Sequence, residues 1–256
     1  MIFIGNQQID VSTISSGYPA GSVEREILTK MNAGSERYEY STVAQLQFEL
    51  KLRREIINAA NELYRSRMAF KVFRDSICNP RYWNRMNDGG FSLKEGVRPS
   101  EAIQDIFINS SLYGTECATA MVIVYYKALL NVFPANQFDR MFPKIYLMNW
   151  HQIDPLLREI GLMRSVSDFL PGDRLYFMNP DVDPTTPEWQ GENVIDMGNG
   201  LYYGHGIGKY NAAVIIDALN QNRKEDADES AYLMDSAGRP NFKKFADLYE
   251  RGLAAA

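Results

Sequence analysis

The sequence predicts a single domain of the α+β class, residues 1–256, in which helices pack against a central antiparallel sheet. Segments with a helical hydrophobic period fill the first half of the chain, and segments rich in Tyr, Ile, Val and Phe follow residue 143. Helices and strands that occur in separate blocks are typical of this class. The 256 residues, 45% of them hydrophobic, suffice for one globular domain and exclude a disordered or disulfide-dense protein.

The first helices are predicted from caps and periodicity. Residues 1–40 lack a sustained period, so we expect an irregular N-terminal arm with a short helix near residues 23–31. Thr42 and Gln45 then have the form of a capping box, and the apolar positions that follow fall on one broad helical face. This pattern predicts a long helix that continues to about Tyr64.

Turn and helix-start signals divide the rest of the chain. Pro99 begins a second helix, and Gly114-Thr115 precedes the most apolar helix, about residues 116–131, which Pro134 ends. Gly198-Asn199-Gly200 predicts a hairpin turn between two strands. The predicted strands are residues 144–150, 173–179, 193–197 and 201–204, and the last helices are residues 211–222 and 241–253.

Charge and hydropathy exclude several classes of partner. A formal net charge of −5 provides no basic surface for nucleic acid. The best apolar run, Cys117–Tyr126, is shorter than the roughly 18 residues that a membrane helix needs. Residues 1–6 lack the basic and apolar regions of a signal peptide. We therefore expect cytoplasmic synthesis, no nucleic-acid or membrane partner, and a monomer.

Cys117 is a candidate nucleophile. It falls in the first turn of the apolar helix, directly after Glu116, where free backbone N–H groups and the helix dipole favour a thiolate. The alternative is that Cys117 is a small buried side chain on an apolar helix, as many free cysteines are.

His205 is a candidate base, because the glycines of Gly204-His205-Gly206 leave its ring accessible. Glu192 begins the hairpin whose second strand leads to His205, so antiparallel pairing can place its carboxylate beside the imidazole and orient it. Asn193 and Asp196 are rivals for this orienting role. In the alternative, His205 is a turn residue and Glu192 a solvated carboxylate at a sheet edge.

The remaining thiol and imidazole, Cys78 and His151, show no helix start or glycine-rich context, and we expect structural roles for both. The Cys and His positions have no spacing typical of metal ligands, so no metal site is predicted. The glycines around His205 follow a hairpin strand without a βαβ unit, which excludes a dinucleotide fingerprint, and no cofactor is expected.

Four segments of the chain form a specific combination: Phe48–Arg53, Glu116–Ala120, Gly191–Ile195 and His205–Gly208. Together they resemble the spore-coat protein-glutamine gamma-glutamyltransferases of bacilli, the small calcium-independent bacterial transglutaminases. The resemblance extends from about residue 40 to about residue 233 and leaves out residues 1–35. It implies a compact core related to papain-like cell-wall cysteine peptidases, with the nucleophile at a helix start and the histidine on the sheet.

The resemblance also implies roles for individual residues. Cys117 matches the nucleophile, His205 its base, and Glu192 the residue that orients the histidine. Glu116 resembles a second acidic residue that can partly substitute. The aromatic residues that match positions near the substrate tunnel are Phe70, Trp150, Tyr176 and Trp189.

The implied reaction is acyl transfer from a protein-bound glutamine to Cys117, with loss of ammonia, and then to a lysine amine of a second protein. The partners would be spore coat proteins with reactive Gln and Lys side chains, and the protein would lie in the spore coat. A papain-like cysteine peptidase or amidase with the same three residues is the alternative enzyme. The non-enzymatic alternative is a structural coat or scaffold protein in which Cys117 is part of the core.

Overall fold

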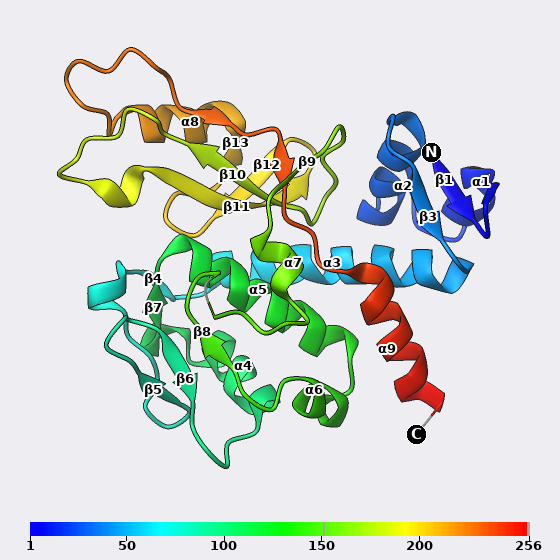
Figure 1. Cartoon of the computed structure of the whole chain (residues 1–256), viewed down its shortest axis with the longest axis horizontal. Coiled ribbons are helices and arrows are strands. Elements are labelled where there is room, and N and C mark those ends of the chain that lie inside the picture. Colours follow the sequence, from blue (N-terminus) through cyan, green and yellow to red (C-terminus); the bar gives the residue numbers. More distant parts are fainter. Residues whose placement is uncertain (151, 255–256) are drawn as a thin grey trace.

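A five-stranded antiparallel sheet lies at the centre of the fold in the computed structural model, which describes residues 1–150 and 152–254. In sheet order its strands are β13 (Gly208–Asn211), β12 (Leu201–Gly204), β11 (Gly191–Gly198), β10 (Arg174–Met178) and β14 (Tyr232–Leu233). Helix α8 (Ala212–Asn220) lies along one face, and α3 (Val43–Arg65) and α5 (Cys117–Val132) lie on the other side (Figure 1). The predicted α+β class and central antiparallel sheet are therefore confirmed.

The alternation of side chains along β11 explains how the sheet is covered on both faces. Val194 belongs to the hydrophobic cluster that includes Ile215 and Leu219 of α8. The next residue, Ile195, belongs to the main cluster with α3 and α5. Because successive side chains of a strand point to opposite faces, the odd-numbered positions of β11 face the start of α5.

The hairpin between β11 and β12 fixes the register of the sheet. Gly198, Asn199 and Gly200 have φ values of 80°, 52° and 71°, all in the left-handed region that glycine and asparagine tolerate best. Val194 then pairs with Gly204, as the predicted turn requires. This register brings the first residues of β11 close to the turn that carries His205.

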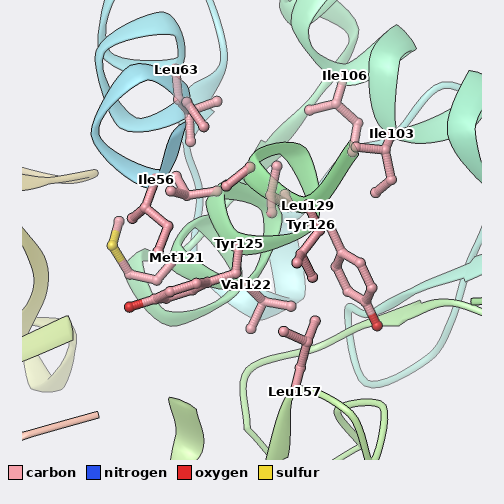
Figure 2. Close-up of a cluster of buried hydrophobic side chains, with 14 of the residues drawn as sticks. Ile56, Leu63, Ile103, Ile106, Met121, Val122, Tyr125, Tyr126, Leu129 and Leu157 are labelled. Carbon is pink, nitrogen blue, oxygen red and sulfur yellow. The ribbon is translucent and has the colours of Figure 1, made fainter. Parts of the chain in front are cut away.

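Helices α3 and α5 form the base on which the sheet rests. The side chain of Thr42 caps α3 by accepting from the backbone N–H group of Gln45, as the capping box predicts. Helix α5 is buried along nearly its whole length, as its uninterrupted apolar sequence requires. Figure 2 shows Ile56 of α3 and Met121 and Leu129 of α5 in the main cluster. This packing holds the N-terminus of α5 against the sheet.

The remaining elements are shorter and surround this base. The other helices after α3 are α4 (Pro99–Ile108), α6 (Ala135–Met141), α7 (Arg158–Gly161) and α9 (Phe242–Ala254). The small sheets pair β4 (Ala69–Phe70) with β7 (Gly114–Thr115), β9 (Arg164–Ser165) with β15 (Ser236–Ala237), and β6 (Phe91–Leu93) with β5 (Trp83–Arg85) and β8 (Tyr146–Leu147). The strand predicted over residues 144–150 is thus only two residues long. Within the described ranges, no helix has the length and hydropathy to cross a membrane.

The prediction of an irregular arm for residues 1–40 is wrong. These residues form β1 (Ile2–Ile4), β2 (Gln7–Gln8), α1 (Val11–Ser15), α2 (Val23–Ala33) and β3 (Tyr38–Tyr40). Strand β1 pairs with β3 in parallel, and Ile27 and Leu28 of α2 pack with Leu46 and Leu50 of α3. Strands of two or three residues are too short to give a periodic pattern, and their pairing depends on contacts distant in sequence. Only the helix expected near residues 23–31 was visible in the sequence.

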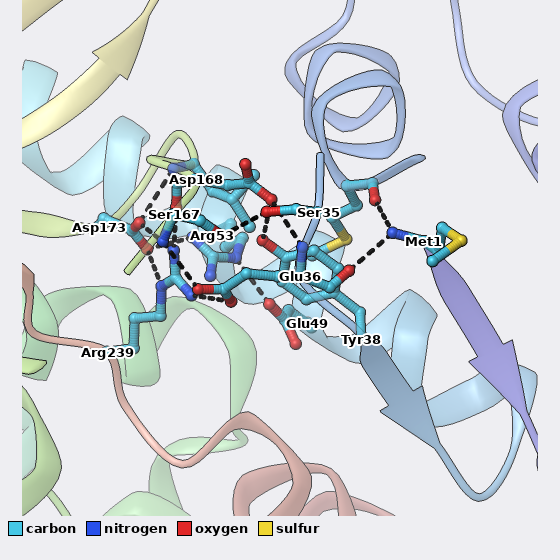
Figure 3. Close-up of polar contacts among 12 residues, drawn as sticks. Met1, Ser35, Glu36, Tyr38, Glu49, Arg53, Ser167, Asp168, Asp173 and Arg239 are labelled. Carbon is cyan, nitrogen blue, oxygen red and sulfur yellow. Dashed lines mark hydrogen bonds and ion pairs between the residues drawn. The ribbon is translucent and has the colours of Figure 1, made fainter. Parts of the chain in front are cut away.

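A buried ionic network connects the N-terminal elements to the sheet (Figure 3). The guanidinium of Arg53 on α3 donates to Glu49 and to Asp173, each at 2.8 Å, and Arg239 donates to Asp173 at 2.8 Å. Arg239 also forms an ion pair with Glu36 at 3.4 Å. Burial disfavours the charged form of Asp173, but the two guanidinium groups outweigh this and hold its pKa below the usual range. The network links four distant segments of the chain.

Candidate active site

The candidate site begins where β7 leads into α5. Cys117 is the first residue of α5 and Glu116 is its N-cap, whose carboxylate accepts from the backbone N–H groups of Ala118 and Thr119. This cap satisfies two of the free donors in the first turn of the helix. It also places a carboxylate directly beside the sulfur of Cys117.

The sulfur of Cys117 faces the start of β11. The side-chain Nδ2 of Asn193 donates to Sγ across 3.6 Å, and the backbone N–H group of Asn193 also favours the thiolate. The thiol and the carboxyl of Glu192 interact through hydrogen bonding and charge. Burial, together with the carboxylates of Glu192 and Glu116, raises the pKa of Cys117 well above its usual range. The resting group is therefore a thiol that must lose its proton to react.

Glu192 is a buried carboxyl whose raised pKa suits a general base. Burial raises its pKa to about 8, and the charge of Glu116 acts in the same direction, whereas a hydrogen bond from the N–H group of Gly206 at 3.2 Å opposes the shift. Burial likewise raises the pKa of Glu116, against its hydrogen bonds to the helix N–H groups. A carboxyl that titrates near the working pH can both accept and return a proton.

The ring of His205 is held between two other groups. Nε2 lies 3.2 Å from the carbonyl oxygen of Ala69 on β4, and Nδ1 lies 3.2 Å from the hydroxyl of Tyr203 on β12. Because a carbonyl oxygen only accepts, Nε2 carries the proton and Nδ1 accepts from Tyr203. Burial lowers the pKa of His205, which keeps the ring neutral, although the hydrogen bond to Ala69 opposes the shift.

The structure thus brings Cys117 together with both expected carboxyl groups, but it does not join Cys117 to the His205 ring. In the described part of the chain, both ring nitrogens of His205 are hydrogen bonded elsewhere. The link between Glu192 and His205 runs through the backbone: the N–H groups of His205 and Gly206 favour the Glu192 carboxylate. The carboxyl expected to orient the histidine is therefore the group that meets the sulfur.

A cavity of about 760 Å³ opens at Cys117. Its walls include three of the four aromatic residues expected near the substrate: Phe70, Trp150 and Tyr176. The fourth, Trp189, is not among the lining residues and packs instead into the cluster beneath α8. A cavity of this size, with aromatic side chains in its wall, can hold an extended side chain next to the sulfur.

The other candidates lie away from this cavity. Asp196 accepts from the backbone N–H group of Gly198 in the hairpin turn. Cys78 packs against the main cluster, and burial raises its pKa to about 11. His151 lies outside the described residues. In residues 1–150 and 152–254, no three His, Cys, Asp or Glu side chains gather as a metal site would require.

Sequence reasoning missed Arg174, which donates to Asn193 beside the sulfur. A single basic residue in a predicted strand usually faces solvent, so it gave no signal by itself. The alternation of side chains along the strand gives such a signal, because it places Arg174 on the same face of the sheet as Tyr176, which was expected near the substrate.

Comparisons with known proteins show the family to which the chain belongs. A family model described as "Protein-glutamine gamma-glutamyltransferase" matches residues 1–249, including the N-terminal residues that the sequence resemblance left out. Proteins named protein-glutamine gamma-glutamyltransferase from Bacillus cereus (strain AH820) and Bacillus anthracis are each 44% identical over 239 residues, which cover 93% of this chain and 86% of theirs.

A solved structure is also similar to this chain in fold. The structure described as "Transglutaminase from Geobacillus stearothermophilus (without C-terminal extension)" is 48% identical, with a TM-score of 0.77, and the match covers 81% of this chain and 98% of that one. The chain therefore belongs to the protein-glutamine gamma-glutamyltransferase family.

Proposed function

We propose that this protein cross-links other proteins by transferring the γ-glutamyl group of a glutamine side chain to the ε-amine of a lysine. The observation that carries the proposal is the position of the Cys117 sulfur, which lies in an aromatic-lined cavity between a carboxyl group and two N–H donors. A sulfur nucleophile at the start of a helix, facing an antiparallel sheet, also supports a core related to papain-like cysteine peptidases.

In the first half-reaction, Glu192 takes the proton of the Cys117 thiol, and the thiolate attacks the γ-carboxamide carbon of glutamine. Collapse of the tetrahedral intermediate breaks the carbon–nitrogen bond. Glu192 returns its proton to the leaving nitrogen, ammonia departs, and a γ-glutamyl thioester remains on Cys117. The raised pKa of Glu192 supports this double role, because the same carboxyl must accept and donate at one pH.

In the second half-reaction, the neutral ε-amine of lysine attacks the thioester carbonyl. Glu192 accepts the proton that the amine nitrogen loses, and the carbon–sulfur bond breaks. The products are the ε-(γ-glutamyl)lysine isopeptide and the Cys117 thiolate, which regains its proton from Glu192. The aromatic side chains of Phe70, Trp150 and Tyr176 favour this amine over water, because apolar side chains around the thioester limit its hydrolysis.

His205 and Glu116 have supporting roles in this scheme. The neutral ring of His205 ties β4 to β12, while its backbone N–H group helps to hold the Glu192 carboxylate. Glu116, the N-cap next to Cys117, also interacts with the sulfur and is the second carboxyl available for proton transfer. The base is thus assigned to Glu192, in place of the role that the sequence gave to His205.

The decisive experiment is amine incorporation into a glutamine-donor protein, followed by mass spectrometry with and without added amine. Cys117→Ala should abolish incorporation, whereas Cys78→Ala should retain most of it, because Cys78 lies away from the cavity. The reverse pattern would refute the assignment. Release of free glutamate side chains at the same rate with and without amine would identify a peptidase or amidase instead.

The resemblance to the spore-coat enzymes of bacilli extends the proposal to spore coat proteins as natural substrates and the spore coat as the location. Deleting the gene in its own host should reduce cross-linked, high-mass coat protein. Coat extracts that are unchanged after deletion would remove this part of the proposal.

A further inference from the structure

Arg174 is a guanidinium group buried beside the candidate nucleophile, with only 3% of its surface exposed. Its hydrogen bonds go to neutral groups: Nε donates to the carbonyl oxygen of Ile160 at 2.7 Å, and Nη1 donates to Oδ1 of Asn193 at 2.6 Å. The face of the guanidinium lies 4.1 Å from the centre of the Trp150 ring. None of these contacts, in the part of the chain that is described, supplies a negative charge.

Burying a cation without a neighbouring carboxylate costs folding free energy. A buried Arg174 is therefore expected to have a role other than stabilising the fold. Burial lowers the pKa of Arg174 to about 10, which leaves the side chain charged at neutral pH. The groups whose negative forms would stabilise it are Tyr125, Tyr176 and Cys117. Burial raises the pKa of both tyrosines, which therefore stay neutral. The pKa of Cys117 is raised as well, so its thiol is neutral at rest. Of these three groups it is the one that the proposed reaction ionises, and its thiolate is then the counter-charge of Arg174.

The contact between Arg174 and Asn193 fixes the orientation of the Asn193 amide. A guanidinium has only donors, so the amide atom 2.6 Å from it must be the oxygen. The opposite atom, Nδ2, then points at the sulfur of Cys117, 3.6 Å away, and can only donate. A turned amide would bring two donors together at Arg174 and present an oxygen to the sulfur.

We propose that Arg174 is a positioning residue for the nucleophile: its guanidinium holds the Asn193 amide with an N–H bond aimed at the sulfur of Cys117, and the pair stabilises the thiolate. The inference rests on the proposed function, because it concerns the nucleophile of that reaction. Asn193 contacts the reacting atom, whereas Arg174 acts through Asn193 and through its charge.

Other charged or titratable groups also face the sulfur and must be considered in any test. Glu116 at the start of α5 and Glu192 on β11 raise the pKa of Cys117 and so disfavour the thiolate. Tyr176 on β10 interacts with the thiolate as well. Arg174 and Asn193 act against the two carboxyl groups. The effect of Arg174 and Asn193 on the thiol is therefore measured by comparing variants at these two positions, with Glu116 and Glu192 unchanged in all of them.

The test is the rate at which iodoacetamide alkylates Cys117 as a function of pH, in a Cys78→Ala background that leaves one thiol. Asn193→Ala and Arg174→Met should each slow alkylation at pH 8 by about 10-fold to 100-fold, the range for losing a hydrogen bond to a charged atom. The pH of half-maximal rate should rise by about one to two units. Arg174→Lys should restore part of the loss, because it keeps the charge.

Asn193→Asp separates positioning from folding. A carboxylate at residue 193 pairs with the guanidinium of Arg174 and keeps the fold, yet it presents a negative charge to the sulfur. We expect thermal stability at least equal to that of the parent, together with the largest rise in the pH of half-maximal alkylation. A rise no larger than that of Asn193→Ala would contradict the placement of the residue 193 side chain against the sulfur.

Asn179→Ala is the matched control. Asn179 follows β10, is 2% exposed, and donates to the carbonyl oxygens of Trp189 and Leu219 away from the sulfur. Its loss should lower the melting temperature without changing the alkylation profile. Folded Arg174→Met and Asn193→Asp proteins with the parental profile would overturn the inference. If the parent protein incorporates no amine while its variants still shift the profile, the proposed function fails and the role of Arg174 stands.

Discussion

Nε2 of His205 donates to the carbonyl oxygen of Ala69 across 3.2 Å and so joins the turn after β12 to strand β4. The next residue of β4, Phe70, forms part of the cavity wall, and its ring centre lies 6.3 Å from that of His205. The histidine therefore connects the five-stranded sheet, which supplies Tyr176 and Asn193 to the cavity wall, to strand β4, which supplies Phe70. This arrangement is consistent with the structural role proposed above for His205.

The first prediction concerns this link. His205→Gln retains an amide that can donate to Ala69 and should retain most of the amine incorporation, whereas His205→Ala should lose about 10-fold or more in kcat/KM. The comparison is made by steady-state incorporation of a fluorescent amine. Equal and complete loss in both variants would instead mark the imidazole as the base.

The second prediction is the pH dependence of the reaction. Because the pKa of Glu192 is raised to about 8, the carboxylate form increases as the pH rises, and kcat/KM should climb through an acid limb near pH 8. Glu192→Gln should lower kcat by about 100-fold or more and remove that limb. A limb that persists in the folded variant would show that another group titrates there.

The third prediction is that Glu192 destabilises the fold at alkaline pH. Its folded-state pKa is raised, so the folded protein binds the proton more tightly than the unfolded chain does. Stability is greatest below the ordinary pKa of glutamate and falls as the pH rises through about 8. Glu192→Gln should therefore melt at a higher temperature than the parent at pH 9, and at a similar temperature at pH 4. Scanning calorimetry at the two pH values measures this difference.

The fourth prediction distinguishes two tryptophans. Trp150 lines the cavity, so Trp150→Ala should raise KM for the glutamine donor and increase the hydrolysis of the thioester relative to amine transfer. Trp189 packs beneath α8, so Trp189→Ala should act mainly by lowering the melting temperature. The ratio of hydrolysed to cross-linked product, read by mass spectrometry, separates them. A higher ratio in the Trp189 variant alone would contradict the assignment of the cavity wall.

The fifth prediction concerns the buried ionic network. Asp173→Asn leaves Arg53 without one of its carboxylates in the interior and should cost about 3–5 kcal/mol of stability at pH 7. Because the pKa of Asp173 is lowered, its contribution is present at neutral pH and is lost as the pH falls below the ordinary range of a carboxyl. Urea unfolding at pH 7 and pH 3 should show the variant losing less stability than the parent on acidification.

Local signals predicted much of the fold and the position of Cys117 at the start of a helix. The cap at Thr42, the hairpin at Gly198-Asn199-Gly200 and the helix start at Cys117 each depend on neighbouring residues, and each lies where it was expected. The strands at the N-terminus depend instead on pairing between Ile2 and Tyr38, which no short window contains.

The chemistry of the site depended on geometry that spacing does not determine. Antiparallel pairing brings Glu192 near His205, but spacing cannot show which of the two side chains turns toward the sulfur. Arg174 was invisible for a related reason, because its partners Asn193 and Ile160 come from separate segments. Such contacts follow from the register of the sheet and the placement of the loops around it.

The ionic network around Arg53 also bears on how the protein reaches its native state. Its hydrogen bonds join residues 120 and 203 positions apart in the chain, from Arg53 to Asp173 and from Glu36 to Arg239. Contacts so distant in sequence form only after long loops have closed, which slows folding in proteins of high contact order. The charged groups therefore pair late in folding, after the N-terminal elements, the sheet and the segment before the last helix have approached one another.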